Sequence, residues 1–159
     1  MPEVSSDLRV FNDFERNPDL LKKFDKVLQA YSAAAIFADV QYRTGVMDSA
    51  IKPAFRAKVT GQAVTVQLSK GDLVDPLKAL EMGQPGDVIV VDAGGDLNTS
   101  VCGGLMGGLA QNRGIRAMIV DGAGRDTDEL EDINWPIWTR AITPRDWYSI
   151  IVAKYFWWI

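Results

Sequence analysis

Hydrophobic residues recur at helical spacing in the first part of the chain and form short runs in the rest. Residues 1–17 are polar and mixed, which is typical of a loose arm. Between residues 19 and 31 the apolar positions repeat every three or four residues, so we predict an amphipathic helix there. The stretch SAAAIFADVQYRTG is expected to continue as helix to Gly45, and residues 46–53 to form a loop.

The next segment changes to the period of a β-strand. AKVTGQAVTVQL (57–68) alternates and is rich in β-branched residues, which predicts a strand or a bent strand pair. Gly61 is expected to mark a bulge or a close approach. A short helix is expected from Asp75 to Leu80, and the apolar runs at 88–92 and 117–121 predict buried strands.

A glycine-rich helical stretch lies between these two strands, at residues 103–113, and Gly114 is expected to end it. The order strand–helix–strand predicts a parallel pair with a helical crossover, so the fold class is α/β. Glycine loops, AGGD and GAGRD, are expected after the two strands, at the sheet edge where ligands of such folds bind. A short acidic helix, TDELEDI, and a strand within WPIWTRAITP are expected to follow.

Composition excludes several kinds of chemistry. The 159 residues are enough for one domain with a core, and the absence of histidine excludes Ser-His-Asp triads, Cys-His dyads and histidine metal sites. The single cysteine, Cys102, excludes an intrachain disulfide, so a reducing cytoplasm is the expected setting. The net charge of −4 argues against nucleic-acid binding, and we find no secretory signal pattern and no apolar run of membrane-span length.

The adjacent charges in DGAGRD have two interpretations. Arg125 and Asp126 form either a solvated loop pair or a site in which Arg125 grips a substrate carboxylate and Asp126 holds a divalent metal such as Mg²⁺. A nucleotide site is disfavoured, because no GxxxxGK[ST] is present and the GxGxxG pattern that begins at Gly122 has Thr127 at its last position.

The start of the glycine-rich helix is also open to two interpretations. The glycines of Gly103-Gly104-Leu105-Met106 either permit close helix–sheet packing or leave backbone N–H groups free to bind an anion. In the second case this cradle and Arg125 meet at the same end of the sheet.

Several stretches together resemble the RraA-like family: AAAIFADVQYRTGVM, IKP and GQAVTV, then PGDVIVVDAGG, CGGLMGGLAQNRGIRAMIVDGAGRD and ITPR. The resemblance runs from about residue 30 to about residue 145, and DGxxRD after GDVxVVD is its most specific part. The family contains divalent-metal-dependent aldolases for 4-hydroxy-4-methyl-2-oxoglutarate, oxaloacetate decarboxylases and a regulator of ribonuclease E. The resemblance implies a β/β/α swivelling-domain fold and a homo-oligomer, a trimer or hexamer with sites between subunits.

The resemblance also implies roles for residues of this chain. Arg125 would bind the carboxylate and enolate side of pyruvate, and Asp126 would be the direct ligand of Mg²⁺ or Mn²⁺. The metal would act as a Lewis acid on the ketone of a 2-oxo acid substrate. The substrate cradle would be Gly103, Gly104, Leu105 and Met106, through the backbone amides of the last two.

Two departures from the family pattern qualify this expectation. Aldolase members carry an acid at the position of Gly104, which helps to order the water around the metal, and Asp92 or Asp96 would substitute for it only if the geometry allows. The family's usual C-terminal strands also have no counterpart in IIVAKYFWWI, so the site is expected to be impaired.

We therefore expect an N-terminal arm and helix at 1–30, an RraA-like domain at 31–145 and an atypical apolar tail at 146–159. The tail is either a core strand or interface element or the result of an early stop or frame shift. The expected activity is a metal-dependent aldolase or oxaloacetate decarboxylase that yields pyruvate. The alternatives are a non-catalytic, protein-binding regulator of the same family and a gene fragment.

Overall fold

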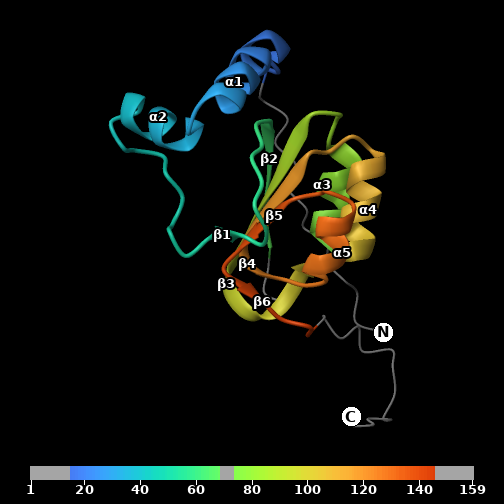
Figure 1. The fold of residues 1–159 in the computed structure, drawn as a ribbon. Helices are drawn as coiled ribbons and strands as arrows, with labels where there is room; N and C mark the ends of the chain where they lie inside the picture. Colours follow the sequence, from blue (N-terminus) through green and yellow to red (C-terminus); the bar gives the residue numbers. More distant parts are fainter. Residues whose placement is uncertain (1–14, 69–73, 146–159) are drawn as a thin grey trace, which may run out of the picture.

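The computed structural model describes residues 15–68 and 74–145, and its centre is a sheet of mixed direction in the order β1-β5-β4-β3-β2, with β6 paired to β4. The strands are β1 (Lys52–Pro53), β2 (Gln62–Gln67), β3 (Asp87–Cys102), β4 (Ala117–Gly124), β5 (Ile137–Thr139) and β6 (Ala141–Ile142). The helices are α1 (Pro18–Ala30), α2 (Ala33–Val40), α3 (Val74–Met82), α4 (Gly104–Asn112) and α5 (Thr127–Asp132). Figure 1 shows α3, α4 and α5 together on one side of the sheet and α1 and α2 apart from them.

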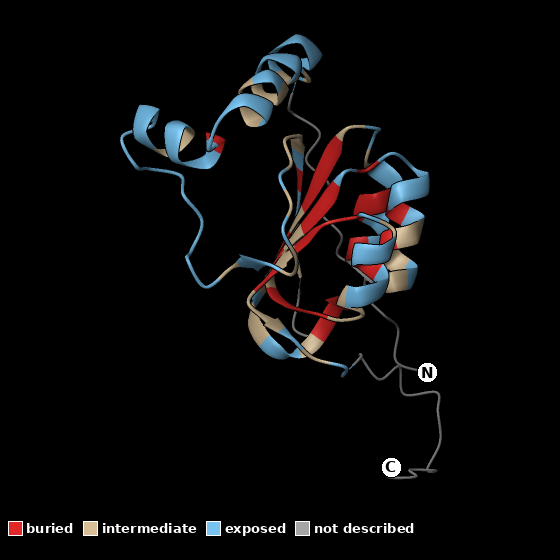
Figure 2. Cartoon of the chain, in the orientation of Figure 1, coloured by how far each residue is buried: buried red, intermediate tan, exposed pale blue. Residues whose placement is uncertain are grey.

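The parallel pair β3–β4 with α4 as its crossover confirms the predicted strand–helix–strand unit. Val88 pairs with Ala117 and the register continues to Asp92 and Asp121, while β2 adds to the other edge of β3 in parallel. The buried positions concentrate on these strands and on the inner sides of the helices that cover them, as Figure 2 shows in red. The largest fully buried side chains include Trp135, Leu80, Ile89, Ile115, Met118, Leu130 and Ile137.

AGGD and the first three residues of GAGRD are instead parts of the strands, which corrects the sequence prediction. β3 runs for 16 residues and passes through AGGD, where Gly94 and Gly95 have φ values of +63° and +71° that glycine adopts readily. The register against β4 shifts three times between Asp92 and Cys102, so the strand is bulged along this length. Because β3 continues this far, its last residue lies beside the last residue of β4, Gly124.

The N-terminal half confirms the first predicted helix and shortens the other predicted elements. α2 ends at Val40 rather than Gly45, since Tyr42 and Arg43 have positive φ values that break a right-handed helix. β1 falls in the predicted loop, and the predicted strand from residue 57 begins only at Gln62. The close approach predicted at Gly61 is confirmed.

Gly61 lies against the loop before β3. A Cβ built on Gly61 would lie 2.6 Å from Val88 Cγ2 and 2.7 Å from the Gly86 carbonyl oxygen. No larger residue fits there without moving backbone, so this glycine sets the distance between β2 and the start of β3.

α1 and α2 form a small unit of their own beyond the sheet. None of the residues of α1 is buried, and the rings of Phe24 and Phe37 meet edge to face at 4.9 Å. A groove of about 670 Å³ lies between these helices and the sheet face formed in part by Ala63, Val90 and Ile119. No helix among the described residues is long and apolar enough to cross a membrane. The expectations for residues 1–14 and for the tail from residue 146 concern parts of the chain outside the described residues.

Candidate functional site

Arg125 and Asp126 directly follow β4, at the carboxyl end of the parallel pair. The Arg125 backbone N–H donates to the Cys102 carbonyl at 2.9 Å, which fixes this end of β4 to the end of β3. Because α4 begins two residues after Cys102, the same bond brings the charged pair to the start of that helix. The structure therefore brings together the two sequence motifs that were predicted to meet.

Asp126 has a strained backbone and a side chain directed at α4. It is the N-cap of α5 with φ +51°, a left-handed conformation that costs most residues free energy but that Asp tolerates. Its carboxylate makes no capping bond to its own helix; Oδ2 instead accepts a hydrogen bond from the Gly104 N–H at 3.1 Å. Oδ2 also lies 3.4 Å from Arg125 Nε, and both side chains are about one-third exposed, at 34% for Arg125 and 37% for Asp126.

The two glycines at the start of α4 make room for these acidic and basic side chains. A Cβ on Gly103 would lie 2.4 Å from Asp126 Oδ2 and 2.8 Å from Arg125 Cγ. A Cβ on Gly104 would lie 1.9 Å from Glu129 Oε2. The interpretation of close helix packing applies one turn later, at Gly107, where a Cβ would meet Leu130 on α5 at 2.2 Å.

The first turn of α4 has exposed backbone and no capping side chain of its own. Gly103 caps the helix in an extended conformation and has no side chain to occupy the free N–H groups. Leu105 is 91% exposed, and Met106 is half-buried against the core. The amides of Leu105 and Met106 therefore begin a helix whose positive dipole end faces the region of Arg125 and Asp126.

Cys102 adjoins this site, but its thiol is buried. Burial raises the pKa of its thiol to about 12, the Asp126 charge contributes in the same direction, and Arg125 opposes it. A thiol with this pKa stays protonated near neutral pH and is therefore a poor nucleophile.

The donors at this end of the sheet fit a hydrated Mg²⁺. No group of three or more His, Cys, Asp or Glu side chains in residues 15–68 and 74–145 is arranged to hold a metal. Mg²⁺, however, usually keeps several waters and binds through one or two carboxylates, and Asp126 presents a partly exposed carboxylate beside the glycine cradle. Glu129 brings a second carboxylate to the same cradle.

The sequence predicts Asp92 or Asp96 as the substitute for an acid at position 104, but the acid that lies beside Gly104 in the structure is Glu129. The Asp92 carboxylate accepts from the Gly94 N–H at 2.9 Å, and that of Asp96 accepts from the Asn98 N–H at 2.9 Å, so both stabilise turns within β3. The signal for Glu129 was its spacing, since it lies three residues after Asp126 in the first turn of a helix, where the two side chains face the same way.

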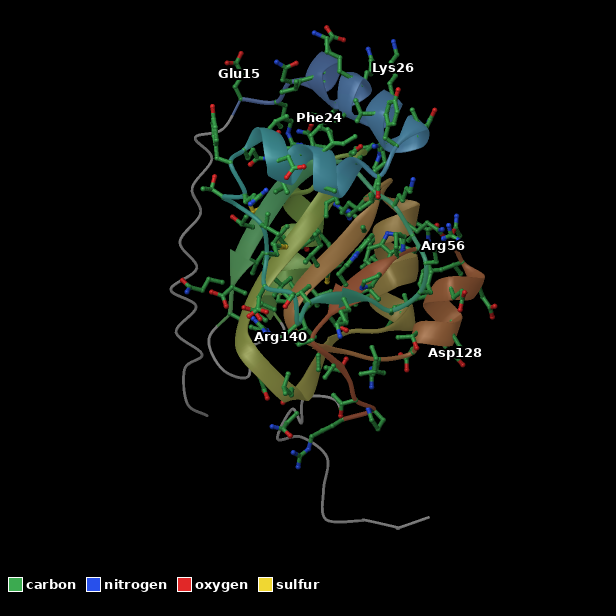
Figure 3. All side chains as sticks on the ribbon, turned by 60° about the vertical axis from the view of Figure 1, so that its left-hand side comes forward. Glu15, Phe24, Lys26, Arg56, Asp128 and Arg140 are labelled. Carbon is green, nitrogen blue, oxygen red and sulfur yellow. The ribbon has the colours of Figure 1, made fainter. Side chains whose placement is uncertain are left out.

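Asp121, the first residue of DGAGRD, belongs to a separate ion-pair cluster. Arg140 Nε donates to Asp121, and Arg140 Nη1 donates to Asp48 at 3.1 Å. These bonds raise the pKa of Arg140 further, while the Ala50 N–H and then Arg140 lower the pKa of Asp48. Asp48 lies in the loop before β1, Asp121 in β4 and Arg140 between β5 and β6, so this cluster joins that loop to the sheet. Figure 3 shows Arg140 well apart from Asp128 of α5.

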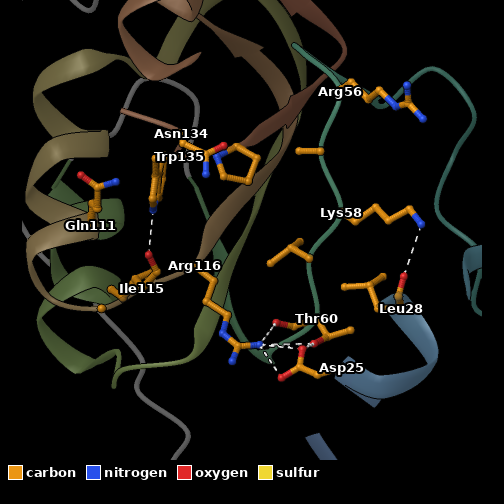
Figure 4. Close-up of a pocket in the computed structure, with 14 residues that line it drawn as sticks. Asp25, Leu28, Arg56, Lys58, Thr60, Gln111, Ile115, Arg116, Asn134 and Trp135 are labelled. Atoms are coloured by element: carbon orange, nitrogen blue, oxygen red, sulfur yellow. Dashed lines mark hydrogen bonds and ion pairs between the residues drawn. The ribbon is translucent and has the colours of Figure 1, made fainter. Parts of the chain in front are cut away.

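A pocket of about 650 Å³ lies at the opposite, amino ends of the strands and contains none of the predicted site residues. Figure 4 shows that Arg116 at this pocket is bonded to Asp25 of α1 and to Thr60, and that Lys58 donates to the Leu28 carbonyl. Arg116 and Lys58 therefore connect α1 to the segments that lead into β4 and β2.

Comparisons with known proteins identify the family that this chain resembles. A family model described as RraA-like, Aldolase/RraA, matches residues 19–150. A protein of Halalkalibacterium halodurans named putative 4-hydroxy-4-methyl-2-oxoglutarate aldolase is 42% identical over 61% of this chain and 47% of its own length. The 4-hydroxy-4-methyl-2-oxoglutarate aldolase of Thermus thermophilus is 34% identical over 57% of this chain and 54% of its own length. The chain thus spans about half the length of these curated relatives.

A solved structure of the RNA-processing inhibitor RraA from the same Thermus species superposes with a TM-score of 0.65 at 27% identity. The superposition covers 75% of this chain and 73% of that one. A Streptomyces coelicolor protein, described as an unusual member of the RNase ES inhibitor RraA protein family, gives 0.68 at 27% identity over 83% of this chain and 68% of that one.

Proposed function

Because this chain belongs to the RraA-like family, whose model matches most of its length, we propose that it is a divalent-metal-dependent lyase that releases pyruvate from a 2-oxo acid. The proposed substrates are 4-hydroxy-4-methyl-2-oxoglutarate, related 4-hydroxy-2-oxo acids and oxaloacetate. The names of relatives support the aldolase class, since proteins up to 42% identical are named for that aldolase reaction.

The observation that carries this proposal is the convergence of Arg125 and Asp126 on the glycine start of α4. A guanidinium, a carboxylate and a helix N-terminus lie within hydrogen-bonding reach of one another, with Gly104 N 3.1 Å and Arg125 Nε 3.4 Å from the same Asp126 oxygen. One anionic ligand and one cation can share such a place, because the positive groups attract the ligand and the carboxylate attracts the cation.

The residues have distinct parts in the proposed reaction. Arg125 orients the 2-oxo acid by a forked contact with its carboxylate, and the amides of Leu105 and Met106 bind the same group from the helix end. Asp126 holds the divalent cation, Mg²⁺ or Mn²⁺. When bound, the cation supplies Lewis-acid stabilisation of the enolate left by carbon–carbon cleavage. No histidine is required at any step, in agreement with the composition.

The assembly and setting remain part of the proposal. We propose a homo-oligomer, a trimer or hexamer, in the cytoplasm. Because the chain spans about half the length of its curated relatives, their activity comes to this chain only as a proposal.

The experiment that tests the function is pyruvate release from oxaloacetate and from 4-hydroxy-4-methyl-2-oxoglutarate, with Mg²⁺ and with EDTA. Release that needs Mg²⁺ and is abolished in Asp126→Ala is expected, since that substitution removes the proposed metal ligand. Equal release by the wild type with Mg²⁺ and with EDTA would contradict the proposed metal dependence. Activity that persists unchanged in Asp126→Ala would show that the ligand has been placed wrongly.

A second function, a non-catalytic regulator that binds another protein, is favoured by one observation. Gly104 occupies the position where aldolase members carry an acid, and structural neighbours at 27% identity are named as inhibitors of RNA processing or of RNase ES. Thermal melting with Mg²⁺ and pyruvate separates the two functions, because ligands that bind only the folded state raise the melting temperature. No shift from a folded wild type would favour the regulator.

A further inference from the structure

The Glu129 carboxylate occupies the space that a side chain at position 104 would fill. A Cβ on Gly104 would lie 1.9 Å from Glu129 Oε2 and 3.0 Å from its Cδ, both far inside van der Waals contact. We propose that Glu129 is the second carboxylate of the divalent-cation site, entering from α5 in place of an acid on α4. This inference rests on the proposed function, because it assumes that Asp126 binds a cation.

Both carboxylates border a single residue. Asp126 Oδ2 accepts the Gly104 N–H from one side, and Glu129 Oε2 lies where the Gly104 side chain would begin. The backbone positions them together, since Asp126 is the N-cap of α5 and Glu129 is in its first turn. Because the Asp126 side chain reaches across to α4 and makes no bond to its own helix, the two acids converge on Gly104.

The carboxylates of Asp126 and Glu129 are suitable ligands for a divalent cation. Two carboxylates, those of Asp126 and Glu129, border Gly104, and the Arg125 guanidinium lies beside Asp126. Two carboxylates with several waters are an ordinary set of ligands for Mg²⁺. The glycine at position 104 is then a requirement of the site, because any side chain there displaces Glu129.

The chain offers a matched control in Asp128, which has the same charge one residue away. Asp128 is exposed on α5, and Figure 3 shows it on the outer side of that helix. Glu129→Gln and Asp128→Asn each remove one negative charge and keep nearly the same shape. A general loss of acidity affects both variants alike, whereas a specific ligand affects only Glu129→Gln.

The test is titration of the folded protein with Mn²⁺ alone, followed by electron paramagnetic resonance of the free ion. We expect Glu129→Gln to weaken Mn²⁺ binding about 10- to 100-fold, Asp128→Asn to change it by less than about threefold, and Asp126→Ala to abolish it. A relocation variant, Gly104→Asp combined with Glu129→Ala, is expected to recover most of the affinity lost in Glu129→Ala.

The outcomes separate this inference from the proposed function. If the wild type binds Mn²⁺ and Asp126→Ala does not, but Glu129→Gln binds as tightly as Asp128→Asn, the role of Glu129 is overturned and the metal site stands. If the folded wild type binds no Mn²⁺, both proposals fail together. Circular dichroism of each variant checks folding, which is expected to be unaffected because Glu129 is exposed.

Discussion

At the amino ends of the parallel strands, arginines and aspartates pair across long stretches of chain, whereas at the carboxyl ends Arg125 and Asp126 are neighbours in sequence and stay partly exposed. Arg16 donates to Asp87, which is only 2% exposed and also accepts the Gln84 N–H at 2.8 Å. Arg116 joins Asp25 at 3.0 Å and so connects α1 to the segment before β4. These charges hold elements together.

At the carboxyl ends of the strands, the arginine and the aspartate are adjacent in sequence instead of joining distant elements. Asp126 sits in a left-handed backbone conformation, and such strain costs of order 1–3 kcal/mol and concentrates at functional sites. Its neighbours are glycines and exposed charges rather than buried partners. Exposure alone does not separate the two ends, since Asp25 and Arg116 are 31% and 40% exposed and Asp126 and Arg125 are 37% and 34% exposed. The amino-end pairs join elements that are distant in sequence, whereas Arg125 and Asp126 are neighbours on a left-handed turn beside the glycines of α4.

Arg125→Ala tests the carboxyl end and is expected to have the largest effect. Pyruvate release per folded molecule should fall at least about 100-fold, because the group that orients the substrate carboxylate is lost. The thermal midpoint should change by less than about 2 °C, since a partly exposed ion pair contributes little to stability. Arg125→Lys is the control and should lose about 10-fold, because lysine keeps the charge without the fork. Equal activity of wild type and Arg125→Ala would contradict the functional role proposed for the carboxyl end.

The sequence predicted the parts of the fold that depend on local pattern. The parallel pair β3–β4, its crossover α4 and the helix α1 follow from hydrophobic spacing and from glycine or proline at element ends, and all three are confirmed. The continuation of β3 through AGGD was not predicted, because glycine pairs are typical of turns. Gly94 and Gly95 do bulge with positive φ values, and pairing with β4 resumes at Asp96. Tertiary contacts decided that outcome.

The candidate site was predictable to a similar degree. Motif order placed Arg125 and Asp126 at the end of a strand and Gly103 at the start of a helix, and the structure brings them together. The contribution of Glu129 depends on the angle between α4 and α5, which packing at Gly107 and Leu130 sets. No local pattern encodes that angle, so the acid beside Gly104 appears only in three dimensions.

Asp87→Ala tests the amino end and is expected to destabilise the protein by about 2–3 kcal/mol, because the Gln84 N–H and the Arg16 guanidinium lose a buried acceptor. For a chain of this size the midpoint should fall by about 4–12 °C. Thermal unfolding measures the loss, and Asp128→Ala, which removes an exposed acid, should shift the midpoint by less than about 2 °C. Pyruvate release per folded molecule should stay unchanged in Asp87→Ala; a loss of activity without a loss of stability would contradict the division between the two ends.

The Asp25–Arg116 pair gives a smaller effect whose pH dependence has a defined sign. The Thr60 hydroxyl and then Arg116 hold the pKa of Asp25 below its ordinary value of 3.8. A carboxylate whose pKa is lowered by folding stabilises the folded state above the unfolded pKa, and this contribution disappears as pH falls through the folded pKa. The contribution is therefore complete at neutral pH and is lost below about pH 3.8.

Asp25→Asn is accordingly expected to destabilise the protein by about 0.5–1 kcal/mol at pH 7, a small value because Asp25 and Arg116 are 31% and 40% exposed. Urea unfolding at pH 7, 5 and 3.5 measures the difference from wild type, which should begin to shrink only at pH 3.5. High salt should also reduce it at pH 7, since exposed charges are screened. Asp19→Asn, which removes a highly exposed acid of α1, is the control and should change stability less at pH 7. A difference between wild type and Asp25→Asn that grows as pH falls would mean that this carboxylate does not stabilise the folded state as an anion, and that the amino end is held by packing alone.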